Sequence, residues 1–346
     1  WYECCTFRGS VVAYNAHTGE QLWKSYAIAE EPKPTRKNSK GVQQWAPAGG
    51  GIWNSPTIDA ERGALYIGSG NSYTAPASDD TDAVIAFDLE TGKRLWWYQL
   101  TTNDTYLINC YSVNDSDEMF IYPEPLSTGR GYRWGPHPDA QYSENCPEPD
   151  MLGPDIDVDI ATSPMLHTLP SGRTILVAGQ QTGRVFALDP DRNGTMLWQL
   201  YPDPKGRGNI TSGITFGGAT DGRLAYFPIH FQSPRGGPRN SKVEAVVSDS
   251  AVVAIRVGTG ELVWYTPTPP PHCADPVPKG CTNGQDGAAS AIPGVVFSGT
   301  RDGMLRAYST DDGHIIWEYD TVQRFETVNE ISANGGSLNG PGPTII

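Results

Sequence analysis

Apolar and polar residues alternate in five short segments of the chain, each followed by a turn and a tryptophan. The five copies are VVAYNAHTGEQLW (11–23), VIAFDLETGKRLW (84–96), VFALDPDRNGTMLW (185–198), VVAIRVGTGELVW (252–264) and LRAYSTDDGHIIW (305–317). Alternation with a period of two predicts a half-buried strand, and the central glycine supplies the positive φ that a tight hairpin turn needs. Each copy is therefore predicted to be a β-hairpin with the tryptophan on its returning strand.

Four of the copies follow another apolar strand, and further extended segments lie upstream of these. The preceding strands are ALYIGSG (64–70), TILVAGQ (174–180), RLAYFPI (223–229) and GVVFSGT (294–300). Strand, strand and hairpin together make a four-stranded antiparallel blade, and a series of such blades predicts an all-β protein of the β-propeller class. Four blades are predicted to be complete, and residues 1–29 supply only the last strands of another. A sandwich built from unrelated hairpins is the alternative.

The spacing of the repeats is uneven, and the extra chain falls near residues 27–51, 101–159 and 266–285. Long insertions on one face of a scaffold commonly carry its binding site. We expect residues 1–346 to form one β-propeller domain that is incomplete at both ends.

Composition narrows the functional classes. The 39 Gly and 29 Pro residues exclude helical bundles, and no apolar run reaches the roughly 18 residues of a membrane helix, so no membrane span is predicted. A net charge of −14 argues against a nucleic-acid partner. The six histidines are scattered singly, and no P-loop, G-x-S-x-G or G-x-G-x-x-G motif supports a nucleotide-binding or hydrolase function.

The cysteines and glycosylation sequons favour an oxidising compartment. Cys273 and Cys281 flank a Pro-rich loop and suit a disulfide, Cys110 and Cys146 could close the long insertion, and Cys4 and Cys5 could pair with each other or reach elsewhere. Six reduced thiols are the alternative. Candidate N-glycosylation sites are Asn103, Asn114, Asn193 and Asn209.

The A-x-D-x-x-T-G-x-x-x-W repeat resembles the tryptophan-docking repeat of the pyrroloquinoline quinone (PQQ) propellers. Four longer segments are similar to the polyvinyl-alcohol-dehydrogenase-like branch of the PQQ-dependent alcohol dehydrogenases: residues 4–23, 49–73, 153–166 and 327–343. Members of this family resemble eight-bladed propellers, which implies that the chain covers about five blades. The outer-membrane assembly scaffold lipoproteins share the repeat without the quinone, so the repeat alone does not imply catalysis.

The resemblance implies a cofactor and a metal. In GGGIW, Trp53 matches the family's tryptophan floor under the quinone, and in GSGN, Asn71 matches the asparagine whose carbonyl oxygen binds Ca²⁺. The turn GQQTG places Gln181 where the family has Lys or Arg, which puts redox competence in question. An ordinary buried tryptophan and a turn asparagine are the structural alternatives.

The resemblance also implies a catalytic base. Alignment of GPDIDVDIATSP places Asp157 at the base, with Asp159 two residues on, where it can face the metal, and Asp155 on the same side of the extended chain. Asp104 in TTNDTY is the second choice for the base. A solvated loop or a structural calcium loop is the alternative for the acidic cluster.

The sequence thus leans towards a periplasmic or secreted quinoprotein enzyme. It would oxidise an alcohol, secondary or polymeric, with PQQ and Ca²⁺. The resemblance implies that calcium polarises the quinone and that an Asp removes the alcohol proton as hydride moves to the cofactor. Because no CxxCH haem motif is present, electrons would pass to an external acceptor such as a cytochrome. The alternative is a non-catalytic propeller, a binding or structural module with partners in an extracellular assembly, which Gln181 favours.

Overall fold

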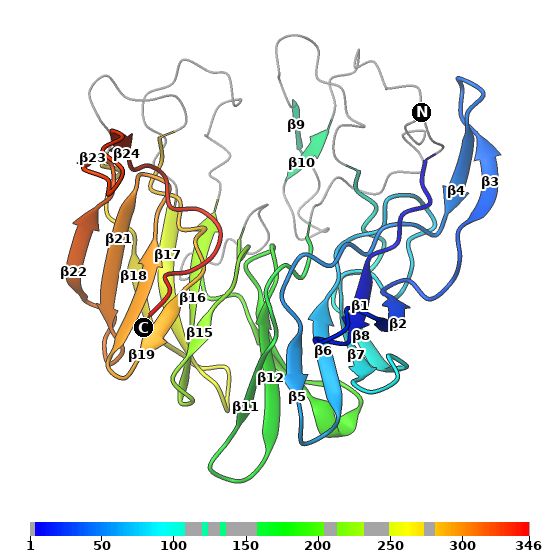
Figure 1. Cartoon of the computed structure of the whole chain (residues 1–346), viewed down its shortest axis with the longest axis horizontal. Helices are drawn as coiled ribbons and strands as arrows, with labels where there is room; N and C mark the ends of the chain where they lie inside the picture. Colours follow the sequence, from blue (N-terminus) through cyan, green and yellow to red (C-terminus); the bar gives the residue numbers. More distant parts are fainter. Residues whose placement is uncertain are drawn as a thin grey trace. The chain divides into compact units, whose positions relative to one another are not determined.

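The computed structural model describes residues 4–107, 120–123, 132–135, 158–203, 213–231, 249–272 and 281–345 (Figure 1). The chain divides into two compact units. Unit 1 comprises residues 1–164, 192–194 and 238–240, and unit 2 comprises residues 165–191, 195–237 and 241–346. Within the described residues the one helical segment is the 3-10 turn η3 (Pro190–Arg192), so the predicted all-β class is confirmed there.

The described residues of unit 1 form one complete four-stranded antiparallel sheet and three two-stranded ones. The complete sheet is formed by β5 (Thr57–Asp59), β6 (Ala64–Gly68), β7 (Ala83–Asp88) and β8 (Arg94–Gln99). The pairs are β1 (Ser10–Tyr14) with β2 (Gln21–Tyr26), β3 (Lys33–Lys37) with β4 (Gln43–Ala46), and β9 (Phe120–Pro123) with β10 (Tyr132–Gly135). The pair β1–β2 is the predicted partial blade, and β3–β4 is a hairpin within the insertion near residues 27–51.

Unit 2 contains the other three predicted blades. They are β11 (Met165–Thr168), β12 (Thr174–Gly179), β13 (Val185–Asp189) and β14 (Thr195–Leu200); β15 (Ala219–Thr220), β16 (Leu224–Phe231), β17 (Asp249–Arg256) and β18 (Leu262–Pro267); and β19 (Ser290–Ile292), β20 (Val295–Gly299), β21 (Met304–Ser309) and β22 (Ile315–Asp320). A short pair, β23 (Arg324–Phe325) and β24 (Ala333–Asn334), follows the last blade. In every blade the strands pair in sequence order.

The hairpin that ends each blade has the same irregular register in all five copies. An alanine pairs with the tryptophan across the ladder, as Ala254 does with Trp264, and the register shifts directly after that alanine. Such a bulge increases the local twist of the hairpin. The turn glycine that follows has a φ between 70° and 75° in every copy, at positions 19, 92, 194, 260 and 313. That conformation favours glycine, which explains why the motif requires it.

The tryptophans lie on the turn glycine of the next copy of the repeat. A Cβ atom added to Gly260 would lie 2.7 Å from Trp198, and one added to Gly313 would lie 2.5 Å from Trp264. The indole nitrogens donate to carbonyl oxygens of the same turns, Trp198 Nε1 to Val257 O (3.0 Å) and Trp264 Nε1 to Thr310 O (3.1 Å). Unit 1 repeats the contact between Trp23 and Gly92 and between Trp96 and Gly194.

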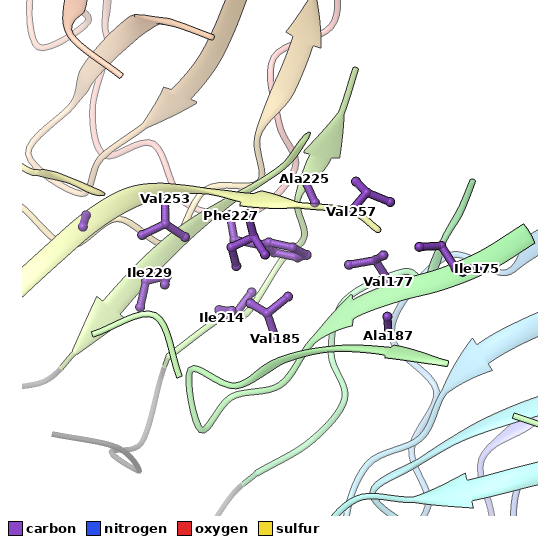
Figure 2. Close-up of a cluster of buried hydrophobic side chains, with 12 residues drawn as sticks. Ile175, Val177, Val185, Ala187, Ile214, Ala225, Phe227, Ile229, Val253 and Val257 are labelled. Carbon is purple, nitrogen blue, oxygen red and sulfur yellow. The ribbon is translucent and has the colours of Figure 1, made fainter. Parts of the chain in front are cut away.

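The core of unit 2 fills the space between successive blades. Alternate residues of β16 and β17, including Phe227 and Val253, pack against β12 and β13 through Val177 and Val185 (Figure 2). The opposite faces of β16 and β17 pack with Trp264 and with Tyr308 of β21. The middle strands are thus buried on both faces. The prediction of a half-buried strand is therefore wrong for β7, β13 and β17, whose residues are buried on both faces.

The repeat offers a matched pair of tryptophans with which to measure the contact. Trp264 is 8% exposed on its glycine, whereas Trp317, at the same place in the last copy, is 46% exposed and stacks on Tyr319 with ring centroids 5.9 Å apart. We expect Trp264→Ala to lower the free energy of unfolding by about 3–5 kcal/mol, the usual range for a buried aromatic residue. We expect Trp317→Ala to cost about 1 kcal/mol or less. Urea unfolding of both variants measures the difference, and equal losses would contradict docking as its source.

Candidate functional site

Four segments of unit 1 that are distant in the sequence meet at the end of β6. They are residues 49–53, 68–72, 104–106 and 158–160. Main-chain hydrogen bonds join Gly70 N to Gly51 O (2.8 Å), Gly50 N to Asn71 O (2.8 Å), Ile160 N to Ser69 O (3.2 Å) and Ser72 N to Asp104 O (3.2 Å). The predicted site residues Trp53, Asn71, Asp104 and Asp159 all belong to these segments.

The glycines of the GSGN turn make this close approach possible. A Cβ atom at Gly70 would lie 2.7 Å from both carboxylate oxygens of Asp159, and one at Gly68 would overlap Ile160 O. Real Cβ atoms do not come that close to other heavy atoms, so a larger residue at either position would displace the 158–160 segment. The turn therefore requires small residues because the segment carrying Asp159 lies directly against it.

Asp159 connects the predicted floor to the predicted metal ligand. Its Oδ2 accepts a hydrogen bond from Trp53 Nε1 (2.8 Å), and its Oδ1 accepts one from the main-chain N of Asn71 (2.9 Å). The carboxyl group is buried, and this burial raises its pKa above the ordinary value, although the two hydrogen bonds act in the opposite direction. Both oxygens thus hold neighbouring groups, a role that the sequence pattern did not reveal.

A hydrogen bond holds one edge of the Trp53 indole, and part of the side chain is exposed. The hydrogen bond to Asp159 holds the nitrogen side of the indole, while the side chain remains 43% exposed. An exposed ring of fixed orientation suits stacking against a planar ligand. The alternative of an ordinary buried tryptophan is wrong at this position.

Asn71 presents its side-chain oxygen as an acceptor. Its Nδ2 donates to Ser72 O (2.7 Å) and to Tyr106 O, so both amide hydrogens are used on main-chain carbonyls. The orientation of the amide is fixed by these bonds, and Oδ1 is left for another partner. An amide oxygen is a ligand that Ca²⁺ accepts. Within the described ranges, however, no three His, Cys, Asp or Glu side chains gather closely enough to form a metal site by themselves.

Of the two candidate bases, the structure describes only one. Asp104 is 2% exposed, its Oδ2 accepts the main-chain N–H of Val158 (3.3 Å), and its own carbonyl holds Ser72. It therefore belongs to the same cluster as Asn71 and Asp159. Asp157 and Asp155 lie outside the described residues, and the assignment of Asp157 as the base stays a prediction.

Two of the expected cysteine features fall on described residues. In the structure Cys4 and Cys5 are joined to each other and pack against Ala48. Cys281 is disulfide-bonded. Cys110, Cys146 and Cys273 lie outside the described residues.

Two of the four candidate N-glycosylation sites lie among the described residues. Asn103 and Asn193 are exposed, with positive φ angles of 58° and 51°. Asn114 and Asn209 lie outside the described residues. Whether any of the four carries a glycan stays a prediction.

Gln181 lies in unit 2, in the turn after β12. Its side chain is buried at 8% exposure, and in the described part of the chain its Oε1 makes no hydrogen bond. The turn itself is fixed by a bond from Gly183 N to Gln180 O (2.8 Å). A buried amide oxygen without a partner is costly.

The raised pKa of Asp159 gives a test of its burial. The folded protein binds the proton of Asp159 more tightly than the unfolded chain does, where the carboxyl group has its ordinary pKa of 3.8. The stability that the protonated group contributes at low pH is therefore lost as the pH rises through the folded-state pKa. With a chelator present, we expect the free energy of unfolding of the wild type to fall relative to that of Asp159→Asn between pH 4 and pH 7. Asp311→Asn, whose side chain is 87% exposed, is the control. A difference between wild type and Asp159→Asn that does not change with pH would contradict the burial.

Comparison with known proteins shows which families two parts of the chain match. Residues 3–108 match the family model described as glucose/ethanol/alcohol dehydrogenase, beta-propeller domain, and residues 248–338 match the model described as outer membrane protein assembly factor BamB. The polyvinylalcohol dehydrogenase of a Pseudomonas species is 38% identical over 345 residues, which is 99% of this chain and 46% of that protein. The polyvinylalcohol dehydrogenase of Sphingopyxis sp. (strain 113P3) is 33% identical over the same shares.

A solved structure supports the fold independently. The quinohemoprotein alcohol dehydrogenase from Comamonas testosteroni matches with a TM-score of 0.55 at 17% identity, over 98% of this chain and 51% of that one. The chain thus spans about half the length of the relatives it matches. We conclude that the chain is a β-propeller with repeats of the PQQ-dependent alcohol dehydrogenase family, and that it is similar to polyvinylalcohol dehydrogenases along almost its whole length.

Proposed function

We propose that this chain carries the quinone- and metal-binding face of a PQQ-dependent alcohol dehydrogenase. The observation that carries the proposal is the joint placement of Trp53 and Asn71 by Asp159. An indole with a fixed edge and an exposed ring lies beside an amide oxygen whose orientation is set by two hydrogen bonds. A planar cofactor and a hard cation need these two features at one place.

The residues present fit both groups. Trp53 would support the ring system, and Asn71 Oδ1 would bind Ca²⁺, with the carboxylates of Asp159 and Asp104 supplying negative charge close by. When bound, PQQ would supply the hydride acceptor and Ca²⁺ would supply Lewis-acid chemistry. The protein's contribution is to orient these groups, which the main-chain bonds among the four segments favour.

We assign the general base to Asp104, with Asp157 as the competing candidate. Asp104 lies in the segment that binds Asn71 through Tyr106 O, and it is buried among groups that orient its carboxylate. Its role would be to accept the hydroxyl proton of the alcohol, and a positioned base commonly contributes 10²–10⁴-fold to the rate.

The relatives support proposals for the substrate, the acceptor and the location. Two of them are named for polyvinyl alcohol, a polymer of secondary alcohols, so we propose a secondary or polymeric alcohol as substrate. An external acceptor such as a cytochrome would take the electrons. A periplasmic or secreted location agrees with the Cys4–Cys5 disulfide. No helix among the described residues is long and apolar enough to cross a membrane.

One observation favours the second candidate, a non-catalytic propeller acting as a binding module in an extracellular assembly. Gln181 is a neutral amide where the resemblance implies a cation, and part of the chain matches an assembly-factor model. Without positive charge at that turn, the reduced and anionic cofactor would be stabilised less. Binding of PQQ with Ca²⁺ and reduction of a dye by a secondary alcohol separate the two functions.

The role of Trp53 can be tested against a matched tryptophan. Trp53 and Trp97 are both 43% exposed and both belong to unit 1, but only Trp53 donates to Asp159. We expect Trp53→Ala to weaken PQQ binding at least about 10-fold, because stacking beyond simple burial contributes roughly 0.5–1.5 kcal/mol in addition to the lost contact area. Trp97→Ala should bind as the wild type does. Titration of quinone absorbance in the presence of Ca²⁺ measures both, and failure of the wild type to bind would overturn the proposed function.

The two candidate bases are separated by their asparagine variants. Asp104→Asn keeps the size of the side chain and removes its ability to take a proton. We expect it to lower kcat about 10²–10⁴-fold with little change in PQQ affinity, while Asp157→Asn leaves kcat within a factor of a few. The reverse pattern in steady-state kinetics would assign the base to Asp157 and refute the assignment made above.

A further inference from the structure

His230, Asp286 and Arg301 form a linked cluster within unit 2, apart from the residues described above. Asp286 Oδ1 lies 2.7 Å from His230 Nδ1, and its Oδ2 is ion-paired with Arg301 Nε. His230 is the penultimate residue of β16, and Arg301 lies in the turn after β20. The three side chains therefore come from two blades and the segment that joins them.

The cluster is tightly constrained. The side chains of His230 and Asp286 are 3% and 1% exposed. Main-chain hydrogen bonds fix His230 and Arg301 in place. His230 N donates to Gly213 O (2.8 Å), and Arg301 N donates to Gly284 O (2.9 Å). A Cβ atom at Gly284 would lie 3.1 Å from both His230 Cε1 and Arg301 Cδ and 3.3 Å from Asp286 Oδ2. The three groups thus form a cradle packed closely around the backbone of Gly284.

The side chain of Arg301 is partly exposed to solvent. The side chain is 31% exposed, and its Nε faces Asp286. In the region that the structure describes, neither Nη nitrogen makes a hydrogen bond. A guanidinium whose inner side is fixed by a buried carboxylate keeps a planar pair of donors in one orientation, which lowers the entropy lost on binding.

The repeat places Arg301 at the same turn position as Gln181. In the turn after β20, Gly303 N donates to Thr300 O (2.9 Å) and Thr300 N donates to Met304 O (3.0 Å). In the turn after β12, the corresponding bonds run from Gly183 to Gln180 (2.8 Å) and from Gln180 to Arg184 (2.9 Å). The two turns share one backbone geometry, and they differ in that one side chain is a neutral amide and the other a cation.

We propose that Arg301 binds a carboxylate group of a small organic ligand through its two Nη nitrogens, and that Asp286 and His230 are the residues that position it. A guanidinium takes a carboxylate through two parallel N–H···O bonds. Because Asp286 offsets part of the charge of Arg301, a singly charged carboxylate is favoured over a more highly charged phosphate. The carboxylate would belong to a small organic acid. PQQ serves as a second probe because it is itself a tricarboxylic acid, and its use rests on the proposed function.

Succinate and PQQ are the two probes, each titrated by calorimetry into the wild type, Arg301→Gln and Arg324→Gln. Arg324 is the control because its side chain is 68% exposed and its partner Glu326 is 3.7 Å away. We expect Arg301→Gln to weaken binding of at least one probe about 10- to 100-fold, the usual range for a charge-assisted pair of hydrogen bonds, and Arg324→Gln to leave it unchanged. Arg301→Lys should lose nearly as much, since lysine keeps the charge without the planar pair of donors.

The positioning role has its own readout. Asp286→Asn leaves the guanidinium charge uncompensated, so we expect the ratio of inorganic phosphate affinity to succinate affinity to rise, whereas simple structural damage would weaken both equally. The ¹⁵N resonances of His230 should shift on ligand binding in the wild type and not in Arg301→Gln, a measurement that does not depend on Asp286→Asn folding.

The outcomes separate this proposal from the proposed function. Succinate binding that depends on Arg301, together with no PQQ binding, would support the carboxylate site and refute the quinone enzyme. PQQ binding that is lost in Trp53→Ala but unchanged in Arg301→Gln, with no succinate binding, would support the quinone enzyme and refute the carboxylate site. Equal affinities of wild type and Arg301→Gln for both probes would overturn the carboxylate site.

Discussion

The contact of an indole with the turn glycine of the next repeat is the constraint on which the rest of the structure depends. It occurs four times in the described residues, twice in each unit, and each time the glycine has a positive φ and no space for a Cβ atom. An alanine opposite the tryptophan and a register shift beside it accompany the contact. Both also occur in the hairpin of Trp317, which is exposed, so they belong to the hairpin itself. The glycine and the tryptophan therefore recur in the sequence because each contact needs one of each. The strands between contacts vary in sequence because they need only be apolar.

The blades were predictable because their signals are local. The motif's glycine and tryptophan lie only a few residues apart along the chain, on either side of the hairpin turn. The middle strands β16 and β17 were also recognisable, since burial on both faces gives continuous apolar runs. The division of the chain into two compact units could not be predicted this way, because it depends on the combined packing of distant segments rather than on any one local pattern.

The site was predictable only in part. Trp53 and Asn71 stand in short motifs whose resemblance carries over residue by residue, and both lie where such groups would be useful. The hydrogen bonds of Asp159 to both of them span 106 and 88 residues, and no local pattern encodes them. An alternating D-x-D segment also cannot say which carboxylate lies inward until the neighbouring Gly70 is known to leave space for Asp159. The sequence shows His230 only as one of six scattered histidines, since its partner Asp286 lies 56 residues away.

A scaffold held by docking contacts allows the chemistry of its loops to change independently. The turns after β12 and β20 have the same backbone hydrogen bonds, although one carries Gln181 and the other Arg301. The fold is not affected by the difference, because neither side chain takes part in the docking of a tryptophan. What each turn can bind is decided by its neighbours: Arg301 has Asp286 to orient it, while the amide oxygen of Gln181 is buried without a protein donor within the described residues. The charge of a turn residue therefore says little about function unless the groups that orient its side chain are known. For Arg301 these groups come from the preceding blade and from the segment that connects the two blades.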